Sequence, residues 1–530
     1  MQFNSRRSNV KARNGMVATS QPLAAMAGLR IMLQGGNAVD AAVAAAATLN
    51  VVEPESTGMG GDLFALVWTA KDKKMWSLNA SGRAPAAASL EQLRKRGWTA
   101  IPDDSSFSIT VPGTVSGWEA LSKRFGSMPL NELLSPAIEY AQKGYPASEV
   151  IAGRWVESVE KLKARPSGTE LLVNGRAPRP GQVVKLAELG KSLKAVAEGG
   201  SEAFYKGPLA IKIAKAVQEA GGWMAAEDLA RHEATWVEPI STDYKGVKCW
   251  ECPPNDQGLN ALMALGLARG FDFKAMGFQT ADTYHHLIEC MRLAFADGAR
   301  YIADPAFAKV PTKQLLSYAY ADKRRKLIRR DAAIEHVVHG EVPGNPDTVY
   351  LSAVDGKGNA CSLINSLFFS FGSGLVVPGT GIALHNRGSL FSLDPDHPNA
   401  LAPGKRPFHT IIPGMATRND ELWLCYGVMG GMQQAQGHLQ VMVNMVDFGL
   451  GPQEALNAPR FKTSLDQGTN LESLTPPGVA DELVRRGHWI AVLPPDGLTF
   501  GSGQVIERDP ETEVLTGASE PRTDGAAVGW

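Results

Sequence analysis

Two apolar segments near the start of the chain are bounded by helix signals. Ser20 can cap the first segment, Pro22 lies in its opening turn, and the glycine pair 35–36 ends it. Asn37 can cap the second segment, which is rich in alanine and continues to about Leu49. Because small side chains permit a close approach, we expect this second helix to pack against a sheet.

The pattern of apolar positions changes character along the chain. Strand-like runs at 63–69 and 74–79 are followed by helical patterns from about 130 to 330, with one strand near 244–251. Strands then dominate, with runs predicted at 348–354, 360–367, 381–385 and 421–427 and one helix from about 434 to 445. Helices in the first half and strands in the second indicate two central sheets covered by helices.

A polar segment separates these two parts. Residues 335–347 contain proline and glycine and few apolar positions, which is typical of a flexible linker. The linker ends at Asp347, and Thr348 begins the next strand-like run. A bond that is cut during maturation would have to lie in such an accessible segment.

Thr348 could therefore become a new chain terminus. Cleavage between Asp347 and Thr348 would place a hydroxyl and a free α-amine on one residue. The amine, with an ordinary pKa of about 7.7–8.0, can remove the hydroxyl proton near neutral pH. Before cleavage the same nitrogen is a peptide nitrogen, so the chain would be an inactive precursor. The alternative is that Thr348 is an ordinary β-branched strand residue.

Composition fits a soluble enzyme. The chain has 530 residues, of which 44% are hydrophobic, and this length alone suggests two to four domains. The net charge of −1 gives no reason to expect nucleic acid or a membrane as a partner. The basic N-terminus lacks a following apolar region, and the apolar stretch 38–52 is too short for the roughly 20 residues of a membrane span.

Five cysteines, an odd number, fit a reducing compartment. Cys249 and Cys252 form a C-x-x-C pattern within a strand-like run, but no second pair accompanies them. We therefore expect structural cysteines and no metal site.

A series of motifs identifies the chain as a relative of a known family. The motifs, in chain order, are at 35–42, 58–61, 111–114, 294–297, 348 with 355–359, 371–374, 379–382, 403–407, 430–431, 447–450 and 457–461. From residue 347 to 461 the chain resembles the small-subunit region of the γ-glutamyltransferases, which are self-cleaving N-terminal-nucleophile hydrolases. The resemblance covers nearly the whole chain.

The resemblance implies a fold and a subunit arrangement. The fold would be a four-layer αββα sandwich of the α/β (α+β) class. Cleavage would give a large subunit, residues 1–347, and a small subunit, residues 348–530, which together form one body as an αβ heterodimer. A dimer of such heterodimers stays open. No cofactor is implied, and the lack of an export segment favours a cytoplasmic enzyme.

The resemblance also assigns catalytic roles. Thr348 would be the nucleophile, and its α-amine the base. Ser366 stands where the family usually has a threonine whose hydroxyl bonds that amine. Gly430 and Gly431 fall on the pair whose backbone N–H groups form the oxyanion hole. The alternative for the two glycines is an ordinary turn after the strand 421–427.

Departures from the family concern substrate binding. Ser81 replaces the arginine that holds the donor's α-carboxylate in relatives that take γ-glutamyl groups, and the nearest arginine is Arg83. Leu390 replaces the acid that grips the α-amino group, and Arg387 replaces an amide or an acid. An ammonium group beside Arg387 would be poorly held.

Three further positions also differ. Phe368 replaces an asparagine, and His409-Thr410 replaces a serine pair. The pocket is thus expected to bind a carboxylate through Arg83, Arg387, His409 and Thr410, without a site for an amine.

We therefore expect a small-molecule substrate, an amide of a small carboxylate-bearing acyl group such as oxamate, and an acyl-enzyme intermediate. The alternative is a γ-glutamyltransferase or glutathione hydrolase acting on γ-glutamyl amides. A catalytically silent binding homologue ranks third. His409 is a competitor of the α-amine for the role of base.

Overall fold

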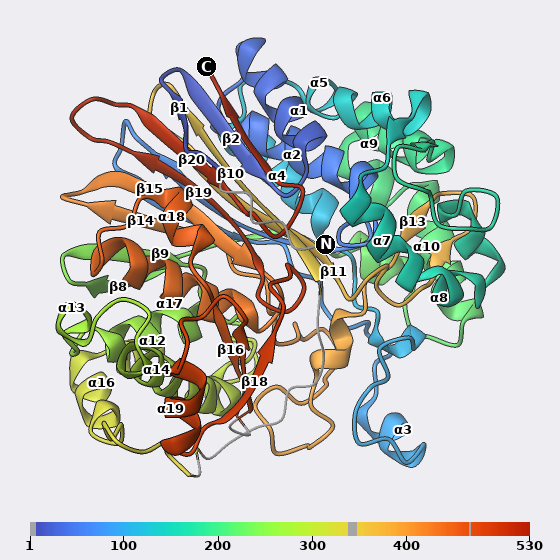
Figure 1. The fold of residues 1–530 in the computed structure, drawn as a ribbon. Coiled ribbons are helices and arrows are strands. Elements are labelled where there is room, and N and C mark those ends of the chain that lie inside the picture. Colours follow the sequence, from blue (N-terminus) through green and yellow to red (C-terminus); the bar gives the residue numbers. More distant parts are fainter. Residues whose placement is uncertain (1–6, 336, 338–346, 466–467) are drawn as a thin grey trace.

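The computed structural model describes residues 7–335, 337, 347–465 and 468–530. Most of the linker predicted at 335–347 therefore lies outside the described residues. Two large antiparallel sheets form the centre of the molecule (Figure 1). The first sheet contains, in spatial order, β21 (Ala526–Gly529), β2 (Gly15–Thr19), β10 (Asp347–Asp355), β11 (Ala360–Phe368), β3 (Asp62–Thr69), β4 (Lys74–Asn79) and β7 (Thr235–Val237).

The second sheet also has seven strands. Their spatial order is β1 (Val10–Ala12), β20 (Leu515–Ser519), β19 (Ser502–Arg508), β15 (Glu421–Met429), β14 (Gly414–Arg418), β9 (Val247–Glu251) and β8 (Ile240–Tyr244). Smaller sheets are made by β5 (Tyr145–Pro146) with β6 (Val183–Val184), β12 (Val376–Val377) with β13 (Ile382–Ala383), and β16 (Phe461–Thr463) with β17 (Gly468–Glu472) and β18 (Trp489–Leu493).

Helices cover the outer face of each sheet, which completes the αββα layering (Figure 1). On the first sheet lie α1 (Pro22–Leu33) and α2 (Ala38–Val52), and on the second lie α12 (Gly258–Ala268) and α17 (Gln433–Val446), with α14 (Ala281–Tyr301) packed against these two helices. The other helices are α3 (Leu90–Lys95), α4 (Thr114–Phe125), α5 (Leu130–Leu133), α6 (Ser135–Lys143), α7 (Glu149–Glu157), α8 (Val159–Lys163), α9 (Ala187–Tyr205), α10 (Pro208–Glu219), α11 (Ala226–Ala230), α13 (Phe273–Met276), α15 (Thr312–Leu315), α16 (Tyr318–Arg325), α18 (Pro452–Asn457) and α19 (Val479–Arg485).

The alanine-rich helix α2 is confirmed as a buried helix against the first sheet. Every residue of α2 is buried, and Asn37 caps it in a capping box with Asp40. The cap predicted for α1 is wrong. Gln21 caps that helix by accepting from the backbone of Leu23, because the Ser20 hydroxyl donates to Glu53 instead, at 2.6 Å.

Most of the predicted strands are confirmed, but one is reduced. Of the strand predicted at 381–385, only Ile382–Ala383 is extended, as β13, and it lies outside both large sheets. Gly379 and Gly381 both have left-handed φ angles, of +66° and +64°, which bend the chain before the strand can lengthen. The single strand predicted near 244–251 is wrong in its extent, because β8 ends at Tyr244 and β9 begins at Val247. The strands β1, β2, β5–β8, β12, β14 and β16–β21 were not predicted.

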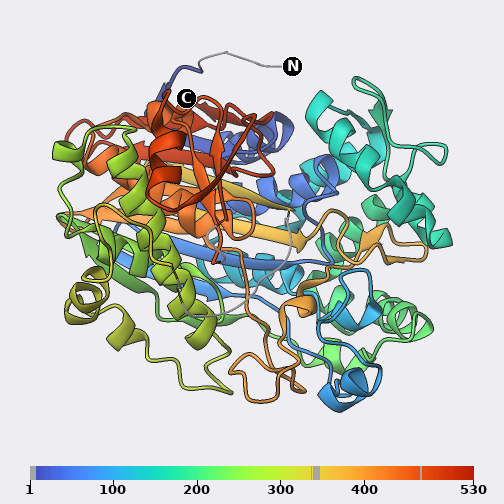
Figure 2. The ribbon, with the colours of Figure 1, turned by 60° about the horizontal axis from the view of Figure 1, so that its bottom comes forward.

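The two sheets pack face to face through a hydrophobic layer of their own. Phe64, Tyr350, Ile364, Met415 and Cys425 are among its buried members. Strands β10 and β11 (yellow in Figure 2) run through the middle of the molecule, so the start of β10 is held inside the structure. Within the described residues, no helix combines the length and the apolar character that are needed to cross a bilayer.

Close contact of the two sheets depends on Gly427 of β15. A methyl group there would lie 2.5 Å from the ring of Tyr350 on β10. The ring cannot move easily, because its hydroxyl is within 2.7 Å of both Ser352 Oγ and Ser362 Oγ.

We expect Gly427→Ala to lower the free energy of unfolding by about 1–3 kcal/mol, the usual effect of overpacking a core. Denaturant titration of the purified variant measures this change. Gly153→Ala is the matched control, since no atom lies within 4 Å of a methyl group added on helix α7. That substitution should be neutral or slightly stabilising. Equal losses in both variants would show that the contact between the sheets does not limit stability.

Candidate active site

Thr348 is fully buried at the start of β10 and faces β11. Asp347 pairs with Phe368 and Val349 pairs with Asn365, so the register shifts by one residue at Thr348. Such a bulge re-aims the side chain that it carries. Here Thr348 Oγ1 lies 3.1 Å from Ser366 Oγ.

Ser366 connects the threonine to a buried arginine. Its Oγ accepts from the backbone N–H of Phe368 at 2.8 Å and from Arg387 Nη2 at 3.1 Å. Arg387 Nη1 donates to Thr410 Oγ1 at 2.7 Å. Four of the residues singled out in the sequence thus form one hydrogen-bonded network, which we call the Thr348 network: Thr348, Ser366, Arg387 and Thr410.

Arg387 is buried and has no counter-ion among the residues that the structure describes. It begins a short 3-10 helix and is 0% exposed. No carboxylate of the described residues lies within ion-pair distance, and Nε has no acceptor among them. Burial lowers the pKa of Arg387 to about 9, against the opposing effect of Asp62. A buried cation of this kind is well suited to receive an anion.

Phe368 covers one face of this guanidinium. The ring lies 4.3 Å from the Arg387 Cζ atom, a cation–π contact. Its φ angle is +80°, which is unfavourable for a bulky residue and costs about 1–3 kcal/mol. The bond from its N–H to Ser366 and the contact with Arg387 hold this conformation. Strain is therefore stored directly opposite the Asp347–Thr348 bond.

His409 belongs to a second buried cluster, with Asp62 and His385. His409 Nε2 lies 3.0 Å and His385 Nδ1 3.8 Å from Asp62 Oδ2. Burial alone would raise the pKa of Asp62, but His385, the hydrogen bond to His409 and Arg387 hold it below its usual value. An ionised carboxylate only accepts, so His409 carries its proton on Nε2. Burial and Arg387 lower the pKa of His409 to about 3.

The two glycines follow the last residue of β15 and precede helix α17. Gly430 has φ +122° and Gly431 has φ +59°, which are conformations that favour glycine. The carbonyl oxygen of Gly431 accepts from Gln257 Nε2 at 2.8 Å. The same nitrogen donates to the carbonyl oxygen of Thr410 at 2.6 Å, so Gln257 joins the glycine turn to the Thr348 network.

Arg83 lies apart from the Thr348 network. Its Nη1 atom is 3.4 Å from Asp304 Oδ2 and 3.1 Å from the carbonyl oxygen of Gly404, and the side chain is 40% exposed. A different arginine, Arg406, contacts Ser81: its Nε donates to the Ser81 carbonyl oxygen at 2.9 Å. Burial, and next the charge of Arg83, lower the pKa of Arg406 to about 10.

Sequence reasoning missed Asp62, Gln257 and Arg406. Asp62 directly follows the glycine motif 58–61, and Arg406 lies inside the motif 403–407. Their positions in or beside these motifs could have identified both residues as candidates for the site. Gln257 carried none, because its role depends on two carbonyl groups that are distant in the sequence.

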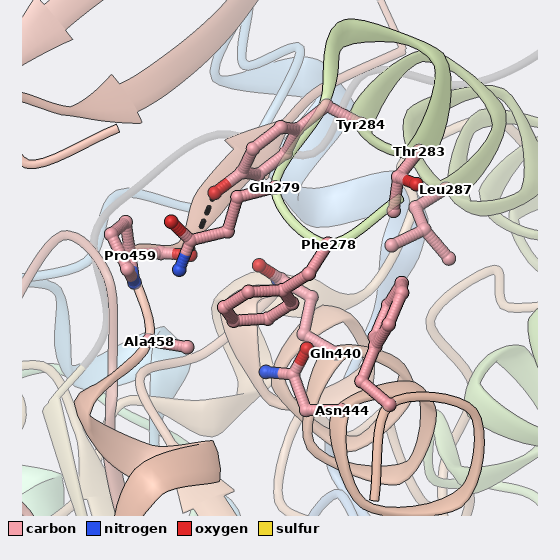
Figure 3. Close-up of a pocket in the computed structure, with 10 residues that line it drawn as sticks. Phe278, Gln279, Thr283, Tyr284, Leu287, Gln440, Asn444, Ala458 and Pro459 are labelled. Atoms are coloured by element: carbon pink, nitrogen blue, oxygen red, sulfur yellow. Dashed lines mark hydrogen bonds between the residues drawn. The ribbon is translucent and has the colours of Figure 1, made fainter. Parts of the chain in front are cut away.

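A pocket on the outer side of the second sheet is separate from this site (Figure 3). It lies between helices α14 and α17, and Tyr284 at its edge donates to the carbonyl oxygen of Pro459 at 3.0 Å. The pocket shares no residue with the Thr348 network. The His, Cys, Asp and Glu side chains in the described part of the chain form no cluster that could hold a metal ion. The five cysteines are buried and unpaired, in agreement with structural roles.

Comparisons with known proteins agree with this geometry. The chain is 37% identical to the glutathione hydrolase-like YwrD proenzyme of Bacillus subtilis (strain 168), over 97% of this chain and 98% of that protein. It is 36% identical to the oxamate amidohydrolase proenzyme of Klebsiella pneumoniae, over 99% of each chain. The solved structure of cephalosporin acylase from Bacillus halodurans superposes with a TM-score of 0.94 at 47% identity, covering 100% of this chain and 98% of that one.

Two stacked antiparallel sheets with a buried threonine at the start of a central strand define an N-terminal-nucleophile hydrolase. The chain belongs to the gamma-glutamyltranspeptidase family, whose sequence model matches residues 24–530. Relatives are named oxamate amidohydrolase proenzyme and glutathione hydrolase proenzyme, so the chain is an amide-hydrolysing enzyme of this family.

The buried histidine predicts a pH dependence. With a pKa of about 3, His409 stays neutral above pH 5 and cannot produce an acidic limb near neutrality. An α-amine must lose its proton to act as base, so kcat/KM should rise with pH through an amine-like pKa. We expect His409→Asn to leave the position of this limb unchanged in pH–rate profiles of cleaved enzyme. Disappearance of the limb in that variant would assign the base to His409.

Proposed function

We propose that the chain cleaves itself between Asp347 and Thr348 and then hydrolyses an amide of a small carboxylate-bearing acyl group, as in oxamate. The large subunit would be residues 1–347 and the small subunit residues 348–530. The observation that carries the proposed substrate is the buried guanidinium of Arg387, which has no carboxylate partner in the described part of the chain and is joined to Thr348 through a single hydroxyl.

The reaction would proceed through an acyl-enzyme. Thr348 Oγ1 attacks the amide carbon and its proton passes to the α-amine of the same residue. The backbone N–H groups of Gly430 and Gly431 stabilise the oxyanion. The C–N bond then breaks, and the departing amine takes the proton from the α-ammonium group. Water attacks the resulting ester by the same route and releases the carboxylic acid.

Geometry favours a short acyl group. Thr348 Oγ1 to Ser366 Oγ and Ser366 Oγ to Arg387 Nη2 are each 3.1 Å, so nucleophile and guanidinium are at most two such steps apart. A carboxylate bonded to Arg387 can therefore lie directly beside the carbonyl group that Thr348 attacks. Arginine suits this task, since its planar fork binds carboxylates in a defined orientation.

A γ-glutamyl amide such as glutathione is the alternative substrate. It is supported by relatives named glutathione hydrolase, one of them 31% identical over 98% of this chain. Arg83 would then have to leave Asp304 to hold the α-carboxylate. A silent binding homologue is disfavoured, since Thr348, Ser366 and both glycines are all present. Covalent labelling of Thr348 by an activated amide separates this last possibility from the other two.

Self-cleavage requires the hydroxyl group of Thr348. We expect Thr348→Ala to remain one chain on denaturing gels, whereas wild-type protein gives two fragments. Thr348→Ser, which retains a hydroxyl, is the positive control and should be cleaved. N-terminal sequencing of the small fragment should begin at Thr348. If Thr348→Ala were split at the same bond, an external protease would be responsible.

Carboxylate recognition should depend on Arg387. Removing one partner of a buried charged hydrogen bond costs about 2–5 kcal/mol, so Arg387→Met should reduce kcat/KM for a carboxylated amide by about 30-fold or more. A neutral amide of equal size should be affected much less. Arg83→Met is the matched comparison, because Arg83 is half-exposed and paired with Asp304.

Steady-state kinetics on the two amides, with cleaved protein in each case, distinguishes the outcomes. A selective loss in Arg83→Met would identify Arg83 as the carboxylate ligand and favour the γ-glutamyl alternative. Equal losses on both amides in Arg387→Met would show that Arg387 supports the fold and not the substrate.

A further inference from the structure

Gln257 is a fully buried side chain that neither the sequence motifs nor the proposed chemistry assigns a role. It precedes helix α12 in the segment 252–257, which follows β9. This segment pairs with the chain around His409: the N–H of His409 donates to Asn255 at 2.9 Å, and the N–H of Gln257 donates to His409 at 3.0 Å. The backbone that carries Gln257 is therefore held in register with the residues before Thr410.

The amide nitrogen of Gln257 uses both of its donors on the candidate active site. It donates to the carbonyl oxygen of Thr410 at 2.6 Å and to that of Gly431 at 2.8 Å. Thr410 holds Arg387 through its hydroxyl, and Gly431 is half of the proposed oxyanion turn. One side chain thus spans the parts of the site that would bind the substrate carboxylate and the developing oxyanion.

The glycine turn needs such a restraint. Both glycines have left-handed φ angles and no side chain, so their own backbone preference fixes the orientation of their N–H groups weakly. A peptide plane whose carbonyl oxygen is held cannot rotate freely, and the N–H on its other side is then fixed as well. The Gly431 carbonyl group shares its peptide plane with the N–H of Met432. The bond from Gln257, together with the one from the Gln434 N–H at 3.1 Å, therefore fixes the end of the turn next to α17 and limits the movement of the turn.

We propose that Gln257 is a positioning residue that holds the Gly430-Gly431 turn at a fixed distance from Thr410 and Arg387, and so couples oxyanion stabilisation to the binding of the acyl carboxylate. The inference rests on the proposed function, because it takes the two glycines as the oxyanion hole. Gln257 would act through backbone geometry, without contact to the reacting atoms.

The test compares Gln257→Met with Gln440→Met. Methionine keeps the length of the side chain and removes both donors. Gln440 on α17, drawn in Figure 3, is also buried and also donates to two backbone carbonyl groups, those of Gln436 at 3.0 Å and Phe461 at 3.1 Å, but it does not touch the Thr348 network. The substrates are two acyl p-nitroanilides of equal size, one with a terminal carboxylate and one without.

We expect Gln257→Met to reduce kcat by about 10-fold or more on both anilides, since removing an oxyanion donor outright costs about 10²–10³-fold in other hydrolases. KM for the neutral anilide should stay within about twofold, because the lost interaction forms only in the transition state. Gln440→Met should keep the wild-type kcat. An unchanged kcat in Gln257→Met, or equal losses in the two variants, would overturn the inference.

A second variant keeps the inference testable if Gln257→Met fails to fold or to cleave. Gln257→Glu has the same shape, and a buried carboxyl group that faces two carbonyl oxygens should have a raised pKa. In its protonated form it can donate one of the two lost bonds. The ratio of its kcat to that of wild type should therefore rise as the pH falls.

Taking this ratio removes the effect of groups common to both proteins, which include Asp256, Glu251, His409 on the paired segment and His438 on α17. A ratio that is independent of pH would contradict the inference. If the proposed function itself were wrong, a different result would be observed: wild-type protein would form no acyl-enzyme with either anilide.

Discussion

Burying a guanidinium group without a carboxylate partner costs free energy, and Arg387 bears that cost at the centre of the candidate site. Hydroxyl groups of Ser366 and Thr410, and the face of Phe368, compensate it only in part, since none of them carries a negative charge. A substrate anion would complete the compensation. The arrangement of the surrounding residues is best understood as a frame that keeps this cation buried and close to Thr348.

The fold supplies that frame from distant parts of the chain. Strands β10 and β11 of the first sheet carry Thr348 and Ser366, while the turn at 430–431 follows β15 of the second sheet. Face-to-face packing of the sheets, with Gly427 against Tyr350, sets the separation of these two halves. Phe368, with its left-handed φ angle, then links the Asp347–Thr348 segment to Arg387, so that strain opposite this segment is maintained by the contacts that surround the guanidinium.

Local signals account for what could be predicted from the sequence. The alanine-rich helix α2, its Asn37 cap and the strands on either side of the 358–359 turn depend on neighbouring residues, and all were predicted. The role of Ser366 beside Thr348 was implied by the family resemblance and not by a local signal, and the structure places the two hydroxyl groups 3.1 Å apart. In contrast, Asp62, Arg406 and Gln257 form hydrogen bonds with groups that are far away in the sequence. The strand β13 is short because Gly379 and Gly381, just before it, have left-handed φ angles. Such effects appear only once the tertiary structure places the segments together.

The charged side chains around Arg387 determine which acyl groups the site can bind. Leu390, at the position where γ-glutamyl-specific relatives have an acid, packs against the hydrophobic core of the second sheet and presents no acceptor side chain to an ammonium group. Asp62 is the carboxylate whose charge raises the pKa of Arg387. It already accepts hydrogen bonds from His409 Nε2 at 3.0 Å and from the N–H of Gly82 at 2.9 Å. Among the described residues, an α-ammonium group would therefore meet one buried cation and no carboxylate that is free to bind it. An acyl group with a carboxylate and no amine fits this site better, because its single negative charge can pair with the positive charge of Arg387.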